Sequence, residues 1–294
     1  MVGAGGRLGA ALYRALRASG EAAFGTRRRR PLARGELLLD LAEGSAAARA
    51  FELPACVDRA FLCAAVTSEV RCRNEREGSR RINVEACVAL AERLVARGAF
   101  VVFPSTDRVF DGSRPRRRAD DPPSPRSAYG EQKAEAERLL LALGAGVAVL
   151  RLGKVVDPEL PLLRSWRREL RAGRPIAPFS DLRLSPIPLA RAAEALRAVA
   201  RARRGGIFQL SAEGDLSYAE VAHELARRLG APEGLVQPVR ASEAGLDLAP
   251  LARHTTLASD RLRDELGLPA PSLREGLEAL LRGAKAPERA PRRR

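Results

Sequence analysis

Short apolar runs alternate with longer amphipathic segments in the first half of this chain, and this alternation constrains the fold more than any other feature. Short apolar runs are typical of buried strands, and apolar residues three and four positions apart are typical of helices. Strands that alternate with helices form parallel sheets covered by helices on both faces. The sequence therefore predicts an α/β fold with a doubly wound parallel sheet.

The expected elements follow from these patterns. The predicted strands are 22–26, 36–40, 59–63, 99–104, 147–152 and 207–210. The predicted helices are 8–18, 82–96, 131–143, 161–171, 189–203, 218–229 and 273–282. We expect an exposed loop at 111–126, because this segment is rich in proline, arginine and aspartate.

The chain divides into a larger and a smaller part. After residue 151 the alternation gives way to segments punctuated by proline, which indicates a smaller second lobe. We expect a sheet domain over 1–155 and a second lobe over 156–283, interleaved with the sheet near 186–211. The charged end, 284–294, is expected to be a disordered basic tail.

The start of the chain leaves little room for a first strand. Only Met1 and Val2 precede Gly3, whereas a phosphate-binding glycine turn normally follows a strand of about five residues. We therefore expect a truncated first strand, either because the true start lies upstream or because the sheet has a gap at its centre. We favour the upstream start, since the loss of several buried residues would cost several kcal/mol of apolar burial.

Composition excludes several function classes. The formal net charge is +15, but the arginine clusters are scattered and only 4% of residues are aromatic, so we expect no specific nucleic-acid partner. The four cysteines lack C-x-x-C spacing, which indicates buried thiols rather than a metal site or disulfides. The longest apolar stretch, 139–150, is far shorter than the roughly 20 residues of a membrane span, and the start does not resemble a signal peptide. We expect a cytoplasmic protein.

A glycine-rich turn opens the first predicted helix. Gly3, Gly6 and Gly9 form the sequence G-A-G-G-R-L-G, which continues into a helix. Such glycines let the backbone approach a pyrophosphate, and the helix start offers free amides. By itself the pattern also fits a tight turn between a strand and a helix.

The end of the next predicted strand carries arginines where an acidic residue would bind a ribose 2′-hydroxyl. Thr26 is followed by four arginines, of which Arg27 and Arg28 come first. Because arginine pairs with phosphate through two charged hydrogen bonds, this segment favours NADP over NAD. A solvated arginine run is the alternative. Asp40 and Leu41, after the following strand, are expected beside the adenine.

Tyr129 and Lys133 are the strongest candidate catalytic pair. Their i, i+4 spacing places both side chains on one face of a helix, so an ammonium can favour the ionised phenol. Such a tyrosine can transfer protons near neutral pH. Ser105 and Thr106 end an upstream strand, where open α/β sheets bind ligands, so either hydroxyl is a candidate to bind a substrate carbonyl.

Together these motifs resemble an extended short-chain dehydrogenase/reductase with a Rossmann-like fold, and more narrowly the dTDP-4-dehydrorhamnose reductase family. The resemblance depends on three segments in register: G-A-G-G-R-L-G at 3–9, S-T-D-R-V-F-D-G at 105–112 and Y-G-E-Q-K at 129–133. It implies an NADPH-dependent reductase of a nucleotide-activated keto-sugar, with NADP(H) in the 1–155 domain and substrate in the second lobe. It is also compatible with a homodimer.

The resemblance also implies roles for individual residues. Thr106 would polarise the sugar carbonyl, Tyr129 would deliver the proton, and Lys133 would lower the pKa of Tyr129 and hold the nicotinamide ribose. The residues expected to line the cofactor are Gly3, Gly6, Arg7, Leu8, Gly9, Arg27, Arg28, Asp40, Leu41, Ala64, Ala65, Tyr129 and Lys133. The residues expected on the substrate side are Ser105, Arg108 and Arg183.

Two departures from the family fall on the substrate side. Arg108 stands where the family usually has tyrosine, and the segment 181–187 differs from the usual D-Q-x-G-x-P-T pattern. These departures motivate a second hypothesis, a non-catalytic NADP-binding regulatory subunit, since the regulatory β subunit of methionine adenosyltransferase resembles the same family. A third hypothesis is a sugar-nucleotide epimerase or dehydratase, in which Asp107 would be the acid beside the hydroxyl residue.

Overall fold

Four parallel strands form the body of the sheet. The computed structural model describes residues 1–30, 32–241, 243 and 252–285. In it, β3 (Arg59–Phe61), β4 (Phe100–Thr106), β5 (Val147–Leu152) and β9 (Gly206–Leu210) pair in the order β3-β4-β5-β9. Every residue of β4 and β5 is buried. A strand covered on both faces reads as a continuous apolar run, which is why these two were evident in the sequence.

The first residues of the chain join this sheet to a second pair of strands. β1 (Gly25–Arg27) pairs in parallel with β2 (Glu36–Leu38). Between β1 and β3 the chain start contributes a single bridge, Val2 with Leu62, and the Met1 carbonyl accepts from the Thr26 N–H. In the part of the chain that the structure describes, the first strand is thus reduced to one bridge.

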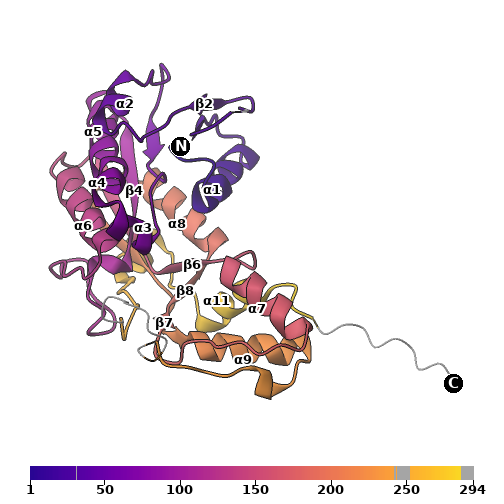
Figure 1. Cartoon of the computed structure of the whole chain (residues 1–294). Helices are drawn as coiled ribbons and strands as arrows, with labels where there is room; N and C mark the ends of the chain where they lie inside the picture. The colour runs from indigo at the N-terminus through magenta and orange to yellow at the C-terminus, as the bar shows by residue number, and fades with distance from the viewer. Residues whose placement is uncertain (31, 242, 244–251, 286–294) are drawn as a thin grey trace.

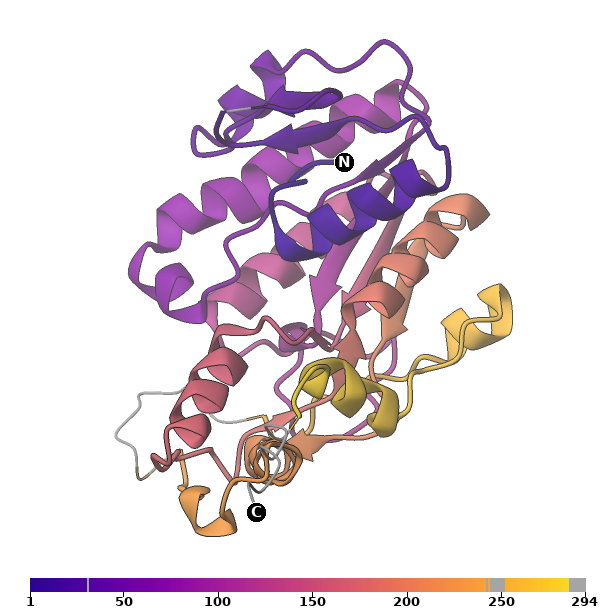
Figure 2. The ribbon, with the colours of Figure 1, turned by 90° about the vertical axis from the view of Figure 1, so that its right-hand side faces the viewer.

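Helices cover both faces of the sheet. In Figure 1, α5 (Cys87–Ala96) and α6 (Ala128–Leu141) lie on one side of β4, and α1 (Arg7–Ala18) and α8 (Leu189–Ala202) lie on the other. Figure 2 brings the α1 and α8 side toward the viewer. Each side buries its own apolar cluster. The predicted doubly wound α/β fold is therefore confirmed.

A third apolar cluster lies below the carboxyl ends of the strands. It is built around α7 (Pro161–Arg171), α9 (Tyr218–Leu229) and α11 (Leu273–Leu281). Capping boxes at Ser217 and Ser272 start the last two helices. Short strand pairs connect this region to the sheet: β6 (Lys154–Val156) with β8 (Pro186–Pro188), and β7 (Arg183–Leu184) with β10 (Leu216–Ser217). The division into parts 1–155 and 156–283 stays a prediction.

The remaining helical elements are short. They are α2 (Ser45–Ala50), α3 (Glu69–Asn74), α4 (Arg76–Arg80), the π-helix η1 (Arg81–Ala86), the 3-10 helix η2 (Asp107–Val109), the 3-10 helix η3 (Glu233–Leu235) and α10 (Asp260–Leu266). The sequence did not predict them separately, because one or two turns are too short to show helical periodicity. None of the helices in the described ranges is long and apolar enough to cross a membrane.

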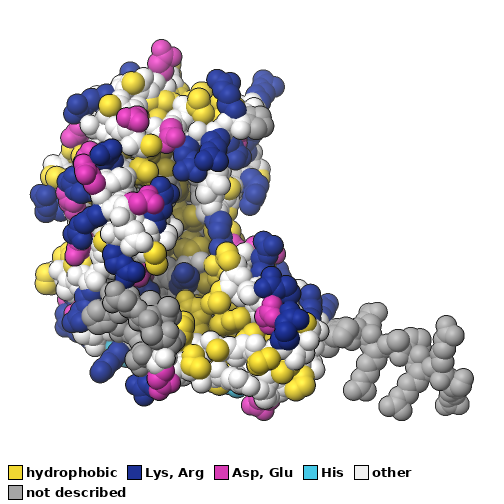
Figure 3. All heavy atoms as spheres, viewed as in Figure 1, with side chains coloured by type: hydrophobic (Ala, Val, Ile, Leu, Met, Phe, Trp, Pro, Cys, Tyr) yellow, Lys and Arg dark blue, Asp and Glu magenta, His cyan; other side chains and the backbone are white. Residues whose placement is uncertain are grey.

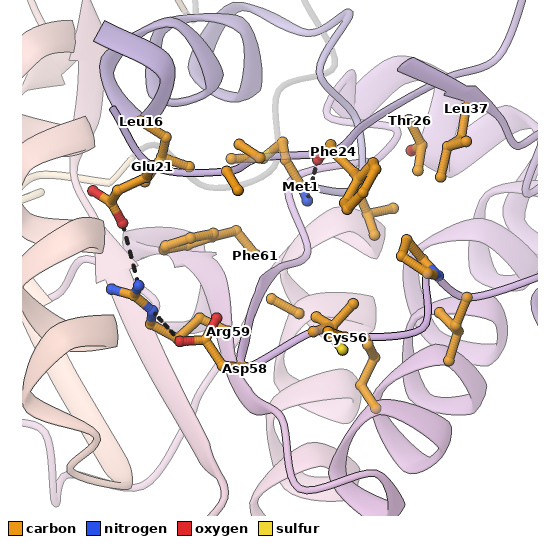
Figure 4. Close-up of a pocket in the computed structure, with 18 of the residues that line it drawn as sticks. Met1, Leu16, Glu21, Phe24, Thr26, Leu37, Cys56, Asp58, Arg59 and Phe61 are labelled. Carbon is orange, nitrogen blue, oxygen red and sulfur yellow. Dashed lines mark hydrogen bonds and ion pairs between the residues drawn. The ribbon is translucent and has the colours of Figure 1, made fainter. Parts of the chain in front are cut away.

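A cavity of about 100 Å³ lies at the amino ends of the strands, where the first strand is truncated. Met1, Phe24, Cys56 and Phe61 are among its lining residues (Figure 4). The Met1 ammonium donates to the Phe24 carbonyl at 2.9 Å, and burial lowers the pKa of this amine to about 6. The cavity therefore marks the volume that a longer first strand would fill.

The loop 111–126 is mostly exposed, as predicted. Within it Arg117 is buried, because its guanidinium stacks on Phe110 and pairs with Asp111 and Asp121. The expectation of four buried cysteines was wrong: Cys56 is exposed, because it lies in a loop ahead of β3 rather than under a helix, and Cys63 is only partly buried. The expected tail 284–294 falls largely on 286–294, which lie outside the described residues.

Candidate active site

The glycine turn brings the start of α1 against the loop that follows β3. Gly3 has a φ of +89°, and a Cβ on it would lie 2.7 Å from the backbone nitrogen of Ala64. A Cβ on Gly9 would clash with the carbonyl oxygen of Gly3. A side chain at either position would separate the turn from the sheet. Gly3, Gly9 and Ala64 are thus together, as expected, and Ala65 follows in the same loop.

The start of α1 is open to an anion. Gly6 is the N-cap and offers no capping side chain, and the first turn contains no acidic residue. A Cβ on Gly6 would meet nothing closer than 3.5 Å, so no packing constraint requires glycine there. Free first-turn amides and the helix dipole attract phosphate groups. The turn therefore fits the pyrophosphate of a dinucleotide.

Arg7 and Leu8 begin this helix but face different surroundings. Leu8 packs against the apolar cluster on the α1 side of the sheet. Arg7 forms an ion pair with Asp157, at 2.5 Å between Nη2 and Oδ2. Because Asp157 follows β6, this pair links the glycine turn to the region below the sheet.

Arg27 lies over the glycine turn and is held by an acidic residue of the neighbouring strand. Its Nη1 is 3.6 Å from the point where a Cβ on Gly5 would stand. Its Nε lies 2.6 Å from Oε2 of Glu36, and Arg27 lowers the pKa of this buried carboxyl. Arg28, by contrast, is exposed. Sequence reasoning placed the arginine but missed Glu36, which carried no motif.

Asp40 and Leu41 follow β2, at the edge of the sheet. Leu41 is buried in the apolar cluster on the α5 side. Asp40 is exposed, and its carboxylate accepts from the backbone N–H of Ala42. The pair is thus divided between a core position and a surface position.

The three candidate catalytic residues come from the end of β4 and the start of α6. Thr106 is the last residue of β4 and is buried. Tyr129 lies in the first turn of α6, whose N-cap, Ser127, accepts from the N–H of Gly130. A Cβ on Gly130 would clash with the Arg108 carbonyl oxygen. This close approach holds the first turn of α6 against the segment that follows β4.

Lys133 joins α6 directly to β4. Its ammonium donates to the Pro104 carbonyl at 2.6 Å and lies 3.5 Å from the ring centroid of Phe103. Burial lowers the pKa of this lysine to about 8. Tyr129 and Lys133 are therefore on one helix face, as expected, with the lysine ammonium on the backbone of β4.

The charges around Tyr129 differ from the sequence expectation. Burial raises the pKa of the Tyr129 phenol, and Asp107 and Glu69 raise it further. The guanidinium of Arg108 acts in the opposite direction and lowers this pKa. The expected lowering of the Tyr129 pKa by Lys133 is not seen in this structure. The cation that favours the ionised phenol is Arg108, from the position where the sequence departs from the family.

Two of the substrate-side candidates, Ser105 and Arg108, lie at the end of β4, whereas the third, Arg183, lies on β7. The Ser105 hydroxyl is buried and has no hydrogen-bond partner within the described part of the chain. Arg108 pairs with Glu69 of α3, at 3.3 Å between Nε and Oε1. Tyr218, the first residue of α9, raises the pKa of Arg108, so this guanidinium lies where the two parts of the molecule meet. Arg183 is exposed on β7, which pairs with the strand leading into α9.

A buried amide network fixes the loop after β3. The Asn83 side chain accepts from the Val66 N–H at 2.7 Å and donates to the Val66 carbonyl at 2.9 Å. It also donates to Gln132 of α6 at 2.8 Å, and Gln132 donates to Ser79. Asn83 belongs to the π-helix η1, a form often found at functional sites. The network therefore couples the helix that carries Tyr129 to the loop containing Ala64 and Ala65.

A second buried network lies behind Thr106. Arg151 of β5 forms hydrogen bonds with Glu137 of α6, the closest at 2.8 Å, and also donates to Gln209. Gln209 in turn donates to the Arg117 carbonyl at 2.7 Å. The segment after β4 is thereby tied to β9, which lies two strands away from β4 in the sheet. No sequence pattern pointed to these residues, since each lies on a different element.

In the view of Figure 3 the surface is hollowed between the sheet part and the lower part. The carboxyl ends of β4, β5 and β9 point toward this junction. The geometry can thus hold a dinucleotide at the glycine turn and present Thr106 and Tyr129 to a second molecule. Such a pair can polarise and protonate a carbonyl oxygen.

Comparison with known proteins gives one family and several relatives. The family described as RmlD substrate binding domain matches residues 1–285. A probable dTDP-4,6-dihydroxy-2-methyloxan-3-one 4-ketoreductase of Streptomyces antibioticus is 31% identical over 238 residues, which are 79% of this chain and 80% of that protein. The methionine adenosyltransferase 2 subunit beta of Bos taurus is 39% identical over 90 residues, 31% of this chain and 27% of that protein. The latter match thus spans about a quarter of that relative's length.

Solved structures with the same fold include sugar-nucleotide enzymes. The structure of MoeE5 in complex with UDP-glucose and NAD has a TM-score of 0.79 at 26% identity, covering 95% of this chain and 96% of that one. The dTDP-4-dehydrorhamnose reductase of Bacillus anthracis in complex with NADP has a TM-score of 0.80 at 23% identity, covering 94% of each chain. The likeness to the second of these concerns the fold alone.

Proposed function

Because the chain belongs to the RmlD substrate binding domain family, we propose that it is an NADPH-dependent reductase of a nucleotide-activated keto-sugar. One observation carries this proposal. Thr106 ends β4, Gly130 beside Tyr129 in the first turn of α6 approaches the Arg108 carbonyl just after that strand end, and Lys133 of α6 donates to the Pro104 carbonyl of β4. The Streptomyces antibioticus relative, named as a keto-sugar ketoreductase, supports the reaction class.

The cofactor is NADP(H). Its pyrophosphate would bind at the uncapped start of α1, where Gly3, Gly6 and Gly9 keep side chains away. The adenosine 2′-phosphate would pair with Arg27, which Glu36 already holds over the glycine turn. Arg28 would add a solvent-exposed charge, and Asp40 and Leu41 would border the adenine. When bound, the reduced nicotinamide supplies the hydride.

The protein residues supply orientation and a proton. Thr106 donates a hydrogen bond to the carbonyl oxygen, on which negative charge develops during hydride transfer. Tyr129 delivers its phenolic proton to this oxygen, so the product is the alcohol. Lys133, whose buried ammonium lies on β4 one turn of α6 after Tyr129, would hold the nicotinamide ribose and help to restore the proton. Asn83 and Gln132 keep the loop at Ala64 and Ala65 in place beside the cofactor.

The nucleotide-sugar substrate is recognised by polar groups at the junction of the two parts. The orphan hydroxyl of Ser105 is available to a sugar hydroxyl. Arg108 and Arg183 provide positive charge for a diphosphate. A substrate that carries a nucleoside diphosphate would therefore bind below the strand ends, with its keto carbon at Thr106.

The test is a binding measurement followed by an assay. Purified protein is titrated with NADPH and with NADH by calorimetry, and NADPH oxidation is then followed with dTDP- and UDP-linked 4-keto-6-deoxy sugars. We expect NADPH-selective binding and turnover with at least one keto-sugar nucleotide. No cofactor binding, or binding without turnover of any sugar nucleotide, would contradict the reductase proposal.

A non-catalytic regulatory subunit is the second candidate. It is favoured by the similarity to the methionine adenosyltransferase beta subunits and by Arg108, which replaces the family's usual tyrosine on the substrate side. In that case NADPH would bind without turnover, and the protein would form a stable complex with a larger enzyme. Co-purification of a catalytic partner in stoichiometric amount, with no reductase activity, would decide in favour of this candidate.

The oligomeric state and the location belong to the same proposal. We expect a homodimer, as the family resemblance implies, and a cytoplasmic location, as the sequence predicts. Light scattering of the purified protein measures the mass directly. A monomer of 31.7 kDa in solution would contradict the dimer.

A further inference from the structure

Arg7 and Asp157 connect the glycine turn to the part of the molecule below the sheet. Arg7 is the first residue of α1, and Asp157 follows β6 in the loop that leads into α7. In Figure 1 this loop lies between α1 above and α7 below. The Arg7 side chain is 46% exposed, so without a partner its guanidinium would sample many positions. The ion pair with Asp157 instead holds it across the junction.

The loop that carries Asp157 is itself held in place. One carboxylate oxygen of Asp157, Oδ1, accepts from the Glu159 N–H at 2.8 Å, and the other, Oδ2, faces Arg7. The Arg167 guanidinium of α7 donates to the Pro158 carbonyl at 2.9 Å. The Asp157 side chain is only 17% exposed. Asp157 is therefore a fixed anchor on the lower part, and Arg7 is the exposed member of the pair.

The guanidinium of Arg7 uses only one of its sides for Asp157. Its Nε lies 3.1 Å and its Nη2 lies 2.5 Å from the same oxygen, Oδ2. A guanidinium has five N–H donors, so the two donors of Nη1 are left over, and they have no other partner within the described part of the chain. The side chain starts from the same turn as the free amides of α1, where a pyrophosphate would bind. An arginine that is fixed at this place can complete an anion site.

We propose that Asp157 is a positioning residue for the cofactor, because it holds the Arg7 guanidinium where its remaining donors meet the pyrophosphate. The proposal rests on the dinucleotide site of the function proposed above. In the complex Arg7 pairs with Asp157 on one side and with a phosphate on the other. The bound dinucleotide is thereby tied through Arg7 to the loop before α7, and this contact slows its release.

A carboxylate near a pyrophosphate also has an opposite, purely electrostatic effect. Two negative charges repel each other, so removal of the Asp157 charge by itself would tighten cofactor binding. Positioning requires contact with Arg7, whereas repulsion requires only proximity. Glu159 separates the two effects, because it lies two residues further along the same loop, is exposed, and forms no ion pair with any described residue. Glu159→Gln removes the same charge without touching Arg7.

The test follows NADPH fluorescence, so it needs no turnover. We expect Asp157→Asn to raise the Kd for NADPH about two- to tenfold, because the variant has to order the long Arg7 side chain when the cofactor binds. The release rate measured by stopped flow should rise by a similar factor. Asparagine can still accept from the Glu159 N–H, so the melting temperature should stay nearly the same. Glu159→Gln is the matched control and should change neither the Kd nor the release rate.

A double-mutant cycle shows whether Asp157 acts through Arg7. Arg7→Gln should weaken NADPH binding by itself, and Asp157→Asn should add nothing in that background. An unchanged or lower Kd in Asp157→Asn, an equal change in Glu159→Gln, or additive effects in the cycle would each overturn the proposal. If the wild type binds no dinucleotide, the cofactor site proposed above fails and this proposal fails with it. If the wild type binds NADPH and Asp157→Asn binds it equally well, this proposal alone fails.

Discussion

The two ends of the sheet differ in how completely they are built. At the carboxyl end, β4 and β5 pair over six residue positions and lead into Thr106, the glycine turn lies against Ala64, and two buried networks brace the loops. At the amino end, the centre of the sheet has one bridge at Val2 and a cavity lined by Met1 and Phe61.

Under the proposed function, catalysis and stability depend on different lengths of the same strand. The proposed site needs the end of the first strand, because Gly3 starts the turn that would face the cofactor. The body of that strand contributes burial and backbone pairing, and little of it is present here. We therefore expect changes at the carboxyl end to alter rate and ligand binding, and changes at the amino end to alter the free energy of unfolding.

The largest effect is expected from Tyr129→Phe, which removes the proton donor and keeps the ring. We expect kcat to fall by about 10²–10⁴-fold, with the melting temperature nearly unchanged. Steady-state kinetics and thermal unfolding measure the two. Tyr13→Phe is the matched control, since the Tyr13 hydroxyl donates to the Gly35 carbonyl away from the site. It should lower stability by about 1 kcal/mol and leave kcat as it is. Equal kcat values for Tyr129→Phe and Tyr13→Phe would contradict the role of Tyr129 as proton donor.

The complementary change is an engineered extension at the amino end. Four apolar residues such as Val-Leu-Val-Val, added ahead of residue 1, would place side chains in the cavity between Phe24 and Phe61. Each side chain that becomes fully buried contributes roughly 1.5–3 kcal/mol, so the free energy of unfolding should rise by several kcal/mol. Urea unfolding measures it, and kcat should stay the same.

A Gly-Ser-Gly-Ser extension of equal length serves as the control for the apolar one. It can form the same backbone pairs but buries no apolar surface. If both extensions raise the free energy of unfolding equally, filling the cavity with apolar side chains contributes nothing beyond backbone pairing. The two ends of the sheet would then differ less in packing than we describe.

The preference for NADPH over NADH tests the proposed cofactor site at the carboxyl end of the sheet, and its expected effect is smaller than that of Tyr129→Phe. Arg27→Ala removes the guanidinium that Glu36 holds over the glycine turn. We expect the Kd for NADPH to rise about tenfold or more, since a hydrogen bond to a charged group contributes roughly 1.5–3 kcal/mol, while the Kd for NADH stays nearly constant. Arg29→Ala is the matched control, because Arg29 is exposed in the loop beyond β1. Calorimetry that gives parallel losses for both cofactors would argue against a 2′-phosphate contact.

A test of another kind uses pH, because each end of the sheet contains an amine whose pKa is lowered by burial. Burial lowers the pKa of the Met1 amine from 8.0 to about 6 and that of Lys133 from 10.5 to about 8. For each amine, the unfolded chain binds more protons than the folded chain at pH values between the lowered and the ordinary pKa. The free energy of unfolding should therefore rise with pH from about 6 to 8 through Met1, and from about 8 to 10.5 through Lys133.

Urea unfolding at a series of pH values measures these two contributions. The apolar extension should remove the first rise, and Lys133→Met should remove the second. If Lys133→Met instead abolishes the rise between pH 6 and 8, the two amines are not the independent groups that the structure indicates.

Much of the fold was predictable because its signals are local. The limits of α7 and α9 coincide with the predicted helices 161–171 and 218–229, since proline and a serine cap mark where they begin. The helix predicted at 131–143 begins earlier, at Ala128, because Ser127 caps it, and this brings Tyr129 into the first turn. The strands β6 and β8 were missed, because two short segments some thirty residues apart reveal their pairing only in three dimensions.

The candidate site was predictable to the same extent. The glycine turn, Thr106, Tyr129 and Lys133 are found where motif spacing placed them, at strand ends and on one helix face. The partners that set their charges were not predictable. Arg27 is paired with Glu36 of the neighbouring strand, and the cation that lowers the Tyr129 pKa is Arg108 rather than Lys133. Both contacts form only when separate elements pack against each other.

The sequence by itself therefore determined the alternation of strands and helices, the glycine turn, and the placement of Thr106 at a strand end and of Tyr129 and Lys133 on one helix face. These are properties of residues near one another along the chain, where periodicity, caps and glycine steric effects act. Only the tertiary structure decided which carboxylate faces which cation, that Asp107 lies against the Thr106 hydroxyl, and that a cavity remains between Phe24 and Phe61. Burial and charge act through space, so they are set by the packing of distant segments.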